Sequence, residues 1–465
     1  MCSILFKNIS YLITMNDNNE ILRNIDILTV DNRINSIGKD IVPMEDSEII
    51  HCDNLVLMPG FVNTHHHLYQ TLFRGIKEVQ DKPLFPWLLG LYEFWKHITP
   101  EVIYYGAMVG FSELLRTGCT TTTDHHYVFP TNTSTKLIDE QIKAALEIGI
   151  RFHTTRGSMS LGRSGGGLPP DSVVQKEEEI LIDSERLINT YHDYNKYAMT
   201  RVALAPCSPF SVSKRLMKET KELARKKSVM LHTHLCETID EEKFCIEKYG
   251  RRPVELMEDL EWIGPDVWFA HGIYLNDREI GAIEGAGIAH CPSSNMKLGS
   301  GICRTSDLVR ENIPVGIGVD GSASNDGSNM WEEVRRTYLL NHLKYGDKGL
   351  TAYEVLKMAT KGGAQVLGRK DIGEIKVDKA ADIIALDLRD IAFAGCHDPL
   401  VSIVCCGNTS MVKYTVVNGK ILVKDGVINT INTEIIGNHA HSLAEALVNK
   451  ERTLSLDKNI DNCIS

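Results

Sequence analysis

The chain has 465 residues, of which 43% are hydrophobic and 24% charged, with a formal net charge of -11. This composition is ordinary for a globular protein with a large core. The acidic balance disfavours a nucleic-acid partner, which would favour a basic surface. Twelve cysteines without regular spacing indicate reduced thiols. Without a signal peptide or a run of about 18 apolar residues, we expect a cytoplasmic protein with no membrane partner.

The first residues, 1–58, predict part of a small β unit. Short runs of β-forming residues alternate there with Asn and Asp clusters, and Asp31-Asn32 indicates a tight hairpin. β-type sequence returns in residues 373–465, where Asn418-Gly419 indicates another turn, before a helical tail. Because chain ends often lie close together, we expect the two regions to form one small β-sandwich domain.

Residues 59–372 alternate between predicted strands and helices. The predicted strands are 61–67, 119–124, 150–156, 201–205, 229–234, 267–271, 287–291 and 315–320. Helices are predicted between them, with Thr99 and Ser213 as N-terminal caps. Eight such alternations over about 260 residues predict an α/β fold, a parallel (β/α)8 TIM barrel. A doubly wound open sheet is the structural alternative.

Three consecutive histidines end the first predicted barrel strand. Side chains alternate along a strand, so His65 and His67 share one face while His66 points away. Two imidazoles side by side at a strand end suit a transition metal such as zinc. A chance surface run is the alternative, and a metal site needs further ligands from other parts of the chain.

Other predicted strands also end in residues that could bind a metal: His234, His271, His290 and Asp320. A single strand histidine is more often a core residue, but barrel active sites gather the C-terminal ends of all strands. Glu237 follows His234 by three residues, which places a carboxylate near the site as a proton shuttle. The fourth strand contains no lysine to bridge two ions, which favours one metal.

These segments resemble the amidohydrolase superfamily, specifically its one-metal deaminases of purines, pterins and triazines. The resemblance covers nearly the whole chain and rests on Pro59–His67, His234–Glu237, Ala270–Gly272, His290–Asn295 and Gly318–Asp326. It implies one divalent metal, Zn2+ or alternatively Fe2+. It implies the following ligands: His65, His67, His234 and Asp320. Glu237, His271 and Asp320 would be catalytic.

The resemblance also implies a reaction. The segments Arg156–Ser164, Gly167–Ser172 and Ala205–Val212 look like a branch that deaminates 8-oxoguanine to urate and ammonia. The ion would lower the pKa of water, and Asp320 would accept its proton. His271 would orient the nucleophile, and Glu237 would pass a proton to the ring nitrogen beside the amine-bearing carbon.

Three residues are candidates for substrate binding. Gln70 stands three residues after His67, where guanine deaminases also have a glutamine. Trp87 resembles an aromatic residue at the pocket wall of related deaminases. Cys207 stands where guanine deaminases carry an arginine, which disfavours guanine itself. Burial in the core is an equally good interpretation of Trp87 and Cys207.

Two other functions fit the sequence. One is a triazine amino- or chlorohydrolase, or an isocytosine or pterin deaminase, with the same metal site. The other is a non-catalytic barrel scaffold, against which the complete ligand set argues. We expect a small heterocyclic substrate as partner, and a homo-oligomer. Residues 157–171 are rich in Gly, Ser and Pro and predict a long loop that could cover the pocket.

Overall fold

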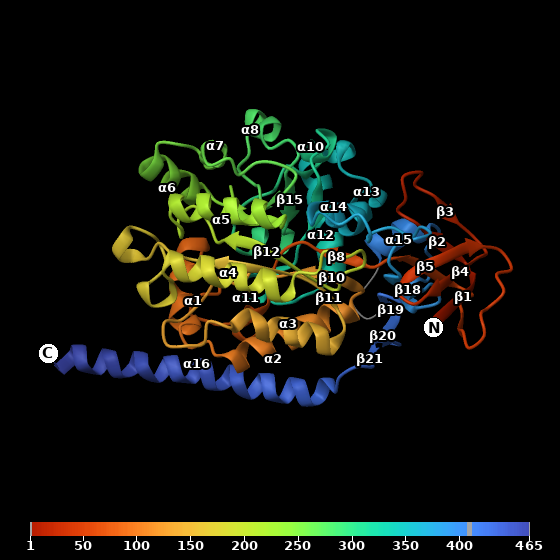
Figure 1. Ribbon diagram of the computed structural model, residues 1–465, viewed down its shortest axis with the longest axis horizontal. Coiled ribbons are helices and arrows are strands. Elements are labelled where there is room, and N and C mark those ends of the chain that lie inside the picture. Colours follow the sequence, from red (N-terminus) through yellow and green to blue (C-terminus); the bar gives the residue numbers. More distant parts are fainter. Residues whose placement is uncertain (1, 407–411, 465) are drawn as a thin grey trace.

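A computed structural model describes residues 2–406 and 412–464, without the side chains of 455–464. Figure 1 shows a barrel surrounded by helices, with a β-rich unit at one end. The barrel strands are β8 (Phe61–Asn63), β10 (Cys119–Thr123), β11 (Arg151–Ser158), β12 (Thr200–Pro206), β13 (Leu231–Leu235), β14 (Val267–His271), β15 (Gly287–His290) and β16 (Val315–Ile317). They form a closed parallel barrel in which β16 pairs with β8. The predicted TIM barrel is confirmed, and the open sheet is excluded.

The first and last barrel strands are shorter than predicted. β8 ends at Asn63, and the chain forms a separate short strand, β9 (His66–His67). β9 pairs in parallel with β17 (Asp320–Gly321), which lies just beyond β16. The two segments therefore extend past the barrel rim as a small ladder of their own. This ladder brings the histidine triplet and Asp320 together.

Helices surround the barrel, and the predicted caps are present. α2 (Pro100–Arg116) begins where the Thr99 hydroxyl accepts a hydrogen bond from the Val102 amide. α5 (Lys214–Lys227) begins similarly at Ser213. The remaining helices of this part are α3 (Leu137–Ile148), α4 (Glu177–Tyr191), α6 (Ile239–Tyr249), α7 (Pro253–Asp259), α8 (Asp277–Ala282), α9 (Pro292–Lys297), α10 (Thr305–Arg310), α11 (Ser322–Asn325), α12 (Met330–Tyr345), α13 (Ala352–Lys357) and α14 (Gly363–Val366).

Two elements at the barrel rim were not predicted. η1 (Leu68–Phe73) is a short 3-10 helix directly after the histidines, and all its residues are buried. α1 (Leu84–Trp95) is rich in apolar residues and also largely buried. Because most of α1 is apolar, its sequence lacks the polar face by which an amphipathic helix is recognised.

The β unit contains strands from both ends of the chain. One sheet has the order β5-β4-β1-β6 and the other has the order β21-β20-β19-β18-β7-β2-β3. The N-terminal strands are β1 (Ser3–Ile9), β2 (Tyr11–Ile13), β3 (Ile21–Leu22), β4 (Ile25–Val30), β5 (Arg33–Gly38), β6 (Glu48–His51) and β7 (Leu55–Pro59). The C-terminal strands are β18 (Ile383–Asp387), β19 (Val412–Val417), β20 (Lys420–Lys424) and β21 (Val427–Ile428). Side chains of both sheets share one apolar core, including Phe6, Ile27, Leu57 and Ile383.

This arrangement confirms that both chain ends build one β-rich region beside the barrel. The pairing of β7 with β18 joins N-terminal and C-terminal sequence directly. The domain limits 1–58, 59–372 and 373–465 stay a prediction. α15 (Pro399–Cys405) follows β18 in the C-terminal part.

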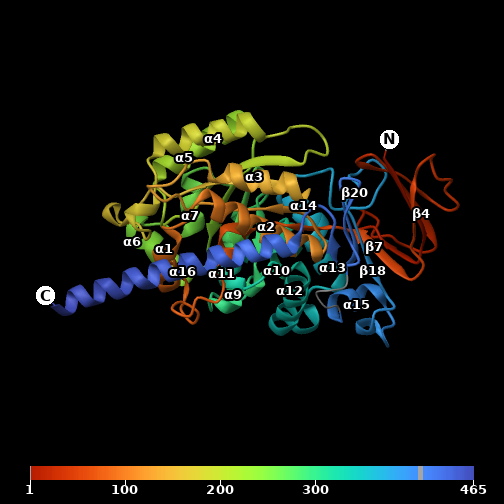
Figure 2. The same cartoon turned by 90° about the horizontal axis from the view of Figure 1, so that it is seen from below.

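The C-terminal helix α16 (Thr433–Ile464) leads from the β unit back along the barrel, as both views show (Figure 1, Figure 2). It packs against α2 and buries Ala440 and Leu447. Within the described part of the chain, no helix has the length and apolar character needed to span a membrane.

Candidate active site

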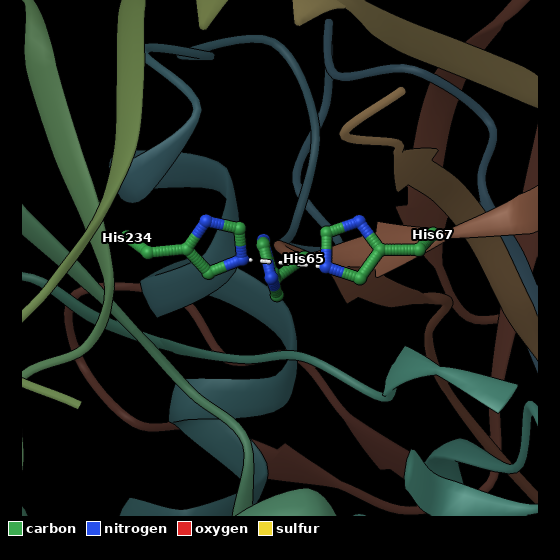
Figure 3. Close-up of side chains that lie close together, drawn as sticks. All are labelled: His65, His67 and His234. Carbon is green, nitrogen blue, oxygen red and sulfur yellow. Dashed lines mark hydrogen bonds between the residues drawn. The ribbon is translucent and has the colours of Figure 1, made fainter. Parts of the chain in front are cut away.

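Four predicted metal ligands meet at the C-terminal rim of the barrel. Asp320 Oδ1 lies 3.2 Å from His67 Nε2 and 3.5 Å from His65 Nε2. The Nε2 atoms of His67 and His234 lie 3.3 Å apart. Figure 3 shows the three imidazole rings converging from different elements. All four side chains are buried.

Hydrogen bonds to backbone carbonyls define the protonation of two of these rings. His67 Nδ1 lies 2.7 Å from the carbonyl oxygen of His125, and His234 Nδ1 lies 2.7 Å from that of Cys207. A carbonyl oxygen only accepts, so each Nδ1 carries the proton. In the neutral rings, both Nε2 atoms then present lone pairs to each other at 3.3 Å. This contact is unfavourable unless a cation lies between the lone pairs.

These residues fit a divalent metal ion. His65 Nε2 is buried and has no hydrogen-bond partner among the described residues. Ring nitrogens of His65, His67 and His234 lie within 4.8 Å of one another. Ring nitrogens of His65 and His271 and a carboxylate oxygen of Asp320 also lie within 4.8 Å of one another. Imidazole nitrogens with one carboxylate form a donor set that suits zinc and similar ions.

The surroundings of Asp320 and His234 favour the protonation states in which these two side chains bind metal. Burial alone would raise the pKa of Asp320, but the imidazoles of His65 and His67 outweigh it and hold this pKa well below its usual range. Burial lowers the pKa of His234 to about 3. An ionised carboxylate and a neutral imidazole are the ligand forms of these side chains.

Glu237 and His271 lie beside this donor set. Glu237 Oε2 is 3.6 Å from His271 Nε2, which in turn is 3.8 Å from Asp320 Oδ2. His271 Nδ1 lies 3.0 Å from Asn295 Oδ1 and donates to it, so Nε2 carries the lone pair. Burial and the Asp320 charge raise the pKa of Glu237 well above its usual range. Glu237 is therefore suited to carry a proton.

The backbone at these positions adopts unusual conformations. His271 has φ +76° and Asp320 has φ +60°, both in the left-handed region. A residue with a Cβ atom costs roughly 1–3 kcal/mol there, and such strain clusters at active sites. His271 ends β14 and Asp320 begins β17, so the two unusual conformations lie at strand ends beside the donor set.

A pocket opens beside the donor set. Its lining residues are His67, Gln70, Leu84, Trp87, Leu88, Tyr92, Tyr127, Cys207, Phe210, His234, Glu237, His271, Leu298, Asp320 and Ser324. All three predicted substrate-binding residues, Gln70, Trp87 and Cys207, are among them. The walls are mostly aromatic or aliphatic, and the polar groups lie together, as in pockets that bind small heterocycles.

Two of the predicted contacts offer free hydrogen-bond donors. Gln70 Nε2 and Trp87 Nε1 are buried and unpartnered within the described chain. The other amide atom, Gln70 Oε1, accepts from the Ala323 amide at 3.3 Å. Gly321 makes room for Gln70, since a Cβ atom at position 321 would lie 1.9 Å from Gln70 Oε1.

The loop 157–171 does not line the cavity. The Leu168 amide donates to the carbonyl of Phe210 at 3.1 Å, and the Leu161 amide donates to that of Ser211 at 3.0 Å. Lys248 Nζ also donates to the Gly166 carbonyl at 2.9 Å. The loop therefore supports the wall residue Phe210 from behind, and the idea of a lid over the pocket has no support in this arrangement.

Some site residues were not identified from the sequence. Tyr92, Leu84 and Leu88 come from α1, which was not predicted. Asn295 lies in a motif that was noted, but its contact with His271 depends on the fold. The rings of His125, His126 and His153, which also lie near strand ends, do not line the cavity. His290, at the end of β15, belongs to none of the metal-competent groups among the described residues.

Comparison with known proteins agrees with this geometry. Residues 56–422 match the amidohydrolase family, so the chain belongs to this family. It is 46% identical over 395 residues to 8-oxoguanine deaminase from Pseudomonas aeruginosa, covering 84% of this chain and 88% of that protein. It is 35% identical to hydroxydechloroatrazine ethylaminohydrolase from Pseudomonas sp. (strain ADP), covering 92% of both chains.

A solved structure is also similar. Atrazine chlorohydrolase from Arthrobacter aurescens TC1, complexed with zinc, has a TM-score of 0.92 and 32% identity, covering 96% of this chain and 100% of that one. The protein is accordingly a hydrolase that acts on carbon–nitrogen bonds, and the scaffold alternative is not supported.

Proposed function

We propose that this protein is a metal-dependent deaminase of an aminopurine-like heterocycle, with 8-oxoguanine as substrate and urate and ammonia as products. The observation that carries the proposal is the position of Glu237. It lies beside the metal-competent donor set, at the base of a cavity with aromatic walls. The 46% identity to an 8-oxoguanine deaminase supports this choice of ring.

One zinc-class ion, with Fe2+ as the alternative, is the proposed cofactor. When bound, such an ion supplies Lewis acidity that makes water a nucleophile near neutral pH. Asp320 has the geometry for two tasks, since Oδ1 faces His65 and His67 while Oδ2 faces His271. Its Oδ2 atom would take the proton from the water, and the His271 Nε2 lone pair would orient that water.

Glu237 would supply the second proton transfer. Its carboxyl group donates a proton to the ring nitrogen beside the amine-bearing carbon while the water oxygen attacks that carbon. The adduct's hydroxyl proton would then return to Glu237, and the amine would take the proton held by Asp320. The carbon–nitrogen bond to the amine breaks, ammonia leaves, and the ring nitrogen keeps the proton that Glu237 delivered. Because Glu237 is buried, it gives up its proton to the substrate rather than to solvent.

Substrate recognition would use the free donors of the cavity. The Gln70 amide and the Trp87 indole N–H can each donate to an oxo group or ring nitrogen of the substrate. Cys207 adds a small side chain without a charge. A neutral, oxygen-rich purine fits this set better than a cation does.

A substrate panel tests the proposal. The metal-loaded enzyme would be assayed for ammonia release from 8-oxoguanine, guanine, isocytosine, pterins and aminotriazines. We expect the highest kcat/KM for 8-oxoguanine. A higher value for a triazine or pterin would favour the alternative with the same metal site. Release of no ammonia from any of them by protein with about one metal equivalent per chain would refute the proposal.

We also expect a homo-oligomer in the cytoplasm without a nucleic-acid partner. Size-exclusion chromatography with light scattering would measure the mass of the assembly. A mass equal to one chain at all concentrations would contradict the first expectation.

A further inference from the structure

The Nδ1 atom of His65, which points away from the other proposed ligands, has an unusual partner. His67 and His234 direct Nδ1 at backbone carbonyls. His65 instead directs Nδ1 at a side chain, the Nε2 atom of His232, at a distance of 2.9 Å. No substitution removes a backbone carbonyl, whereas a side-chain partner can be exchanged by mutation.

The protons of this pair can be assigned from the structure. His232 Nδ1 lies 2.9 Å from the carbonyl oxygen of Trp268, which only accepts. The proton of neutral His232 is therefore on Nδ1, and its Nε2 carries a lone pair. His65 must then donate its Nδ1–H to that lone pair. As a result the other nitrogen of His65, Nε2, presents a lone pair to the ligand position.

Packing holds His232 in this orientation. Its ring stacks on Trp268 with a centroid distance of 4.4 Å and an interplanar angle of 14°. The two residues are also paired across β13 and β14. The Trp268 indole N–H donates to the carbonyl of Thr64 at 3.2 Å, next to His65 in the chain. Trp268 thus fixes both His232 and the backbone that carries His65.

We propose that His232 is a positioning residue for the metal. It sets the tautomer and direction of His65, so that His65 Nε2 is free to bind the ion. The inference rests on the proposed metal-dependent function and deepens it, because it assigns a role to a buried histidine that neither binds the ion nor lines the cavity. Partners of this kind typically contribute 10–100-fold to metal affinity.

A second metal ion is the competing interpretation of the same residues. Ring nitrogens of His65, His125 and His232 also lie within 4.8 Å of one another. However, the Nε2 atom of His125 lies 2.9 Å from the Ala205 carbonyl and donates to it. The space between His65 and His232 is occupied by the shared proton. A second ion there would require His65 to lose both ring protons, so we expect one ion per chain.

The experiment compares two substitutions of His232. His232→Phe keeps a ring that can stack on Trp268 but offers no acceptor. His232→Gln keeps an acceptor near the Nε2 position. Zinc affinity would be measured by chelator competition, and cobalt-substituted protein would report ligand geometry by its visible absorption. We expect a 10–100-fold higher zinc Kd and an altered cobalt spectrum for His232→Phe. His232→Gln should stay within about threefold of the parent protein and keep its spectrum.

His153→Phe is the matched control. His153 is also buried in the barrel beside Trp268, with ring centroids 5.9 Å apart, and its ring nitrogens have no partner among the described residues. Its substitution should leave the zinc Kd within about twofold, because His153 contacts no ligand. An unchanged Kd for folded His232→Phe would overturn the proposal. An equal loss of zinc affinity in His153→Phe and His232→Phe would also overturn it. So would a zinc Kd for His232→Gln as high as that for His232→Phe.

Two measurements that leave His232 unchanged keep the proposal testable if His232→Phe does not fold. Metal analysis after zinc saturation should give one equivalent, and a second equivalent lost in His125→Ala would overturn the proton assignment. In zinc-loaded protein with 15N-labelled histidine, NMR should show the His65 Nδ1 proton coupled to His232 Nε2. Absence of this proton would contradict the proposal. None of these readouts uses a substrate. If His232→Phe loses zinc affinity while the zinc-loaded parent protein shows no deaminase activity, only the proposed function is refuted.

Discussion

Glu237 and Glu241 are buried carboxylates on one short segment, and they have different tasks. Glu237 faces the cavity, next to His271. Glu241 points back at the chain, where its two oxygens accept the amides of Cys236 and Glu237 at 2.9 and 2.8 Å. Cys236 has φ +56°, a conformation that needs such support. For a single residue, the direction of the carboxylate therefore decides whether it can take part in the reaction or stabilises the backbone.

Glu237→Gln should leave metal binding intact and abolish turnover. The amide keeps the size of the side chain but cannot deliver a proton to the ring, so we expect kcat to fall at least about 100-fold. Ammonia release and metal analysis on the same sample measure both effects. Asp240→Asn is the control, because this half-exposed side chain forms a surface ion pair with Lys243. Full activity in Glu237→Gln would refute the proton-transfer role.

Glu241→Ala should destabilise the folded protein. It leaves two buried amides without acceptors, and each costs about 1–3 kcal/mol. We expect the free energy of unfolding, measured with urea, to fall by about 2–6 kcal/mol. Asp240→Ala, one residue earlier on α6, should change it by less than about 0.5 kcal/mol. Equal effects of both substitutions would show that Glu241 does not support the turn.

At the scale of elements, the pocket depends on layers stacked behind η1. The Thr71 hydroxyl of η1 donates to the Gly106 carbonyl of α2 at 2.7 Å. Helix α16 packs against α2 and also contacts η1. A C-terminal helix far from Gln70 in the sequence therefore supports the element on which Gln70 lies.

Leu447→Ala and Leu454→Ala form a matched pair on α16. Leu447 is 8% exposed and Leu454 is 40% exposed. Removing the buried side chain should lower the free energy of unfolding by about 2–3 kcal/mol, because it leaves a cavity against the barrel. Removing the exposed Leu454 side chain should lower the free energy of unfolding by less than about 1 kcal/mol. Denaturant unfolding measures both, and a reversed order would contradict the packing of α16.

At the scale of the whole molecule, a buried ion pair joins the barrel to the β unit. Arg151 begins β11, and its guanidinium contacts both oxygens of Asp382, next to β18, at 3.0 and 3.1 Å. It also donates to the carbonyls of Tyr197 and Ala198. Arg151 has no exposed surface. The relative position of the two parts therefore depends on side chains far apart in the sequence.

Arg151→Met should destabilise the whole protein. Removing one partner leaves Asp382 buried without its counter-charge, and such a loss costs about 3–5 kcal/mol. Lys143→Met is the control, because the Lys143–Glu140 pair lies on the surface and contributes less than about 1 kcal/mol. Thermal unfolding would compare the two variants. Similar midpoints would show that the ion pair does not hold the parts together.

Much of this organisation could be predicted from sequence because it is local. Strand runs ending in His65, His67, His234 and Asp320 follow from hydrophobic patterning and from the chemistry of strand ends. α1 was missed because its mostly apolar sequence shows no clear helical face. The break after Asn63 was missed because it arises from the pairing of β9 with β17, which lie more than two hundred residues apart in the chain.

The sequence alone determined the alternation of strands and helices, and the residue types that could form a metal site. Only the tertiary structure decided which atom of each side chain faces the site. The Nε2 lone pairs of His67 and His234 follow from carbonyls just beyond the ends of β10 and β12, and that of His65 follows from His232. The ring nitrogen that carries the proton depends on which hydrogen-bond acceptor the fold places beside it. The spacing of residues along the chain does not identify that acceptor.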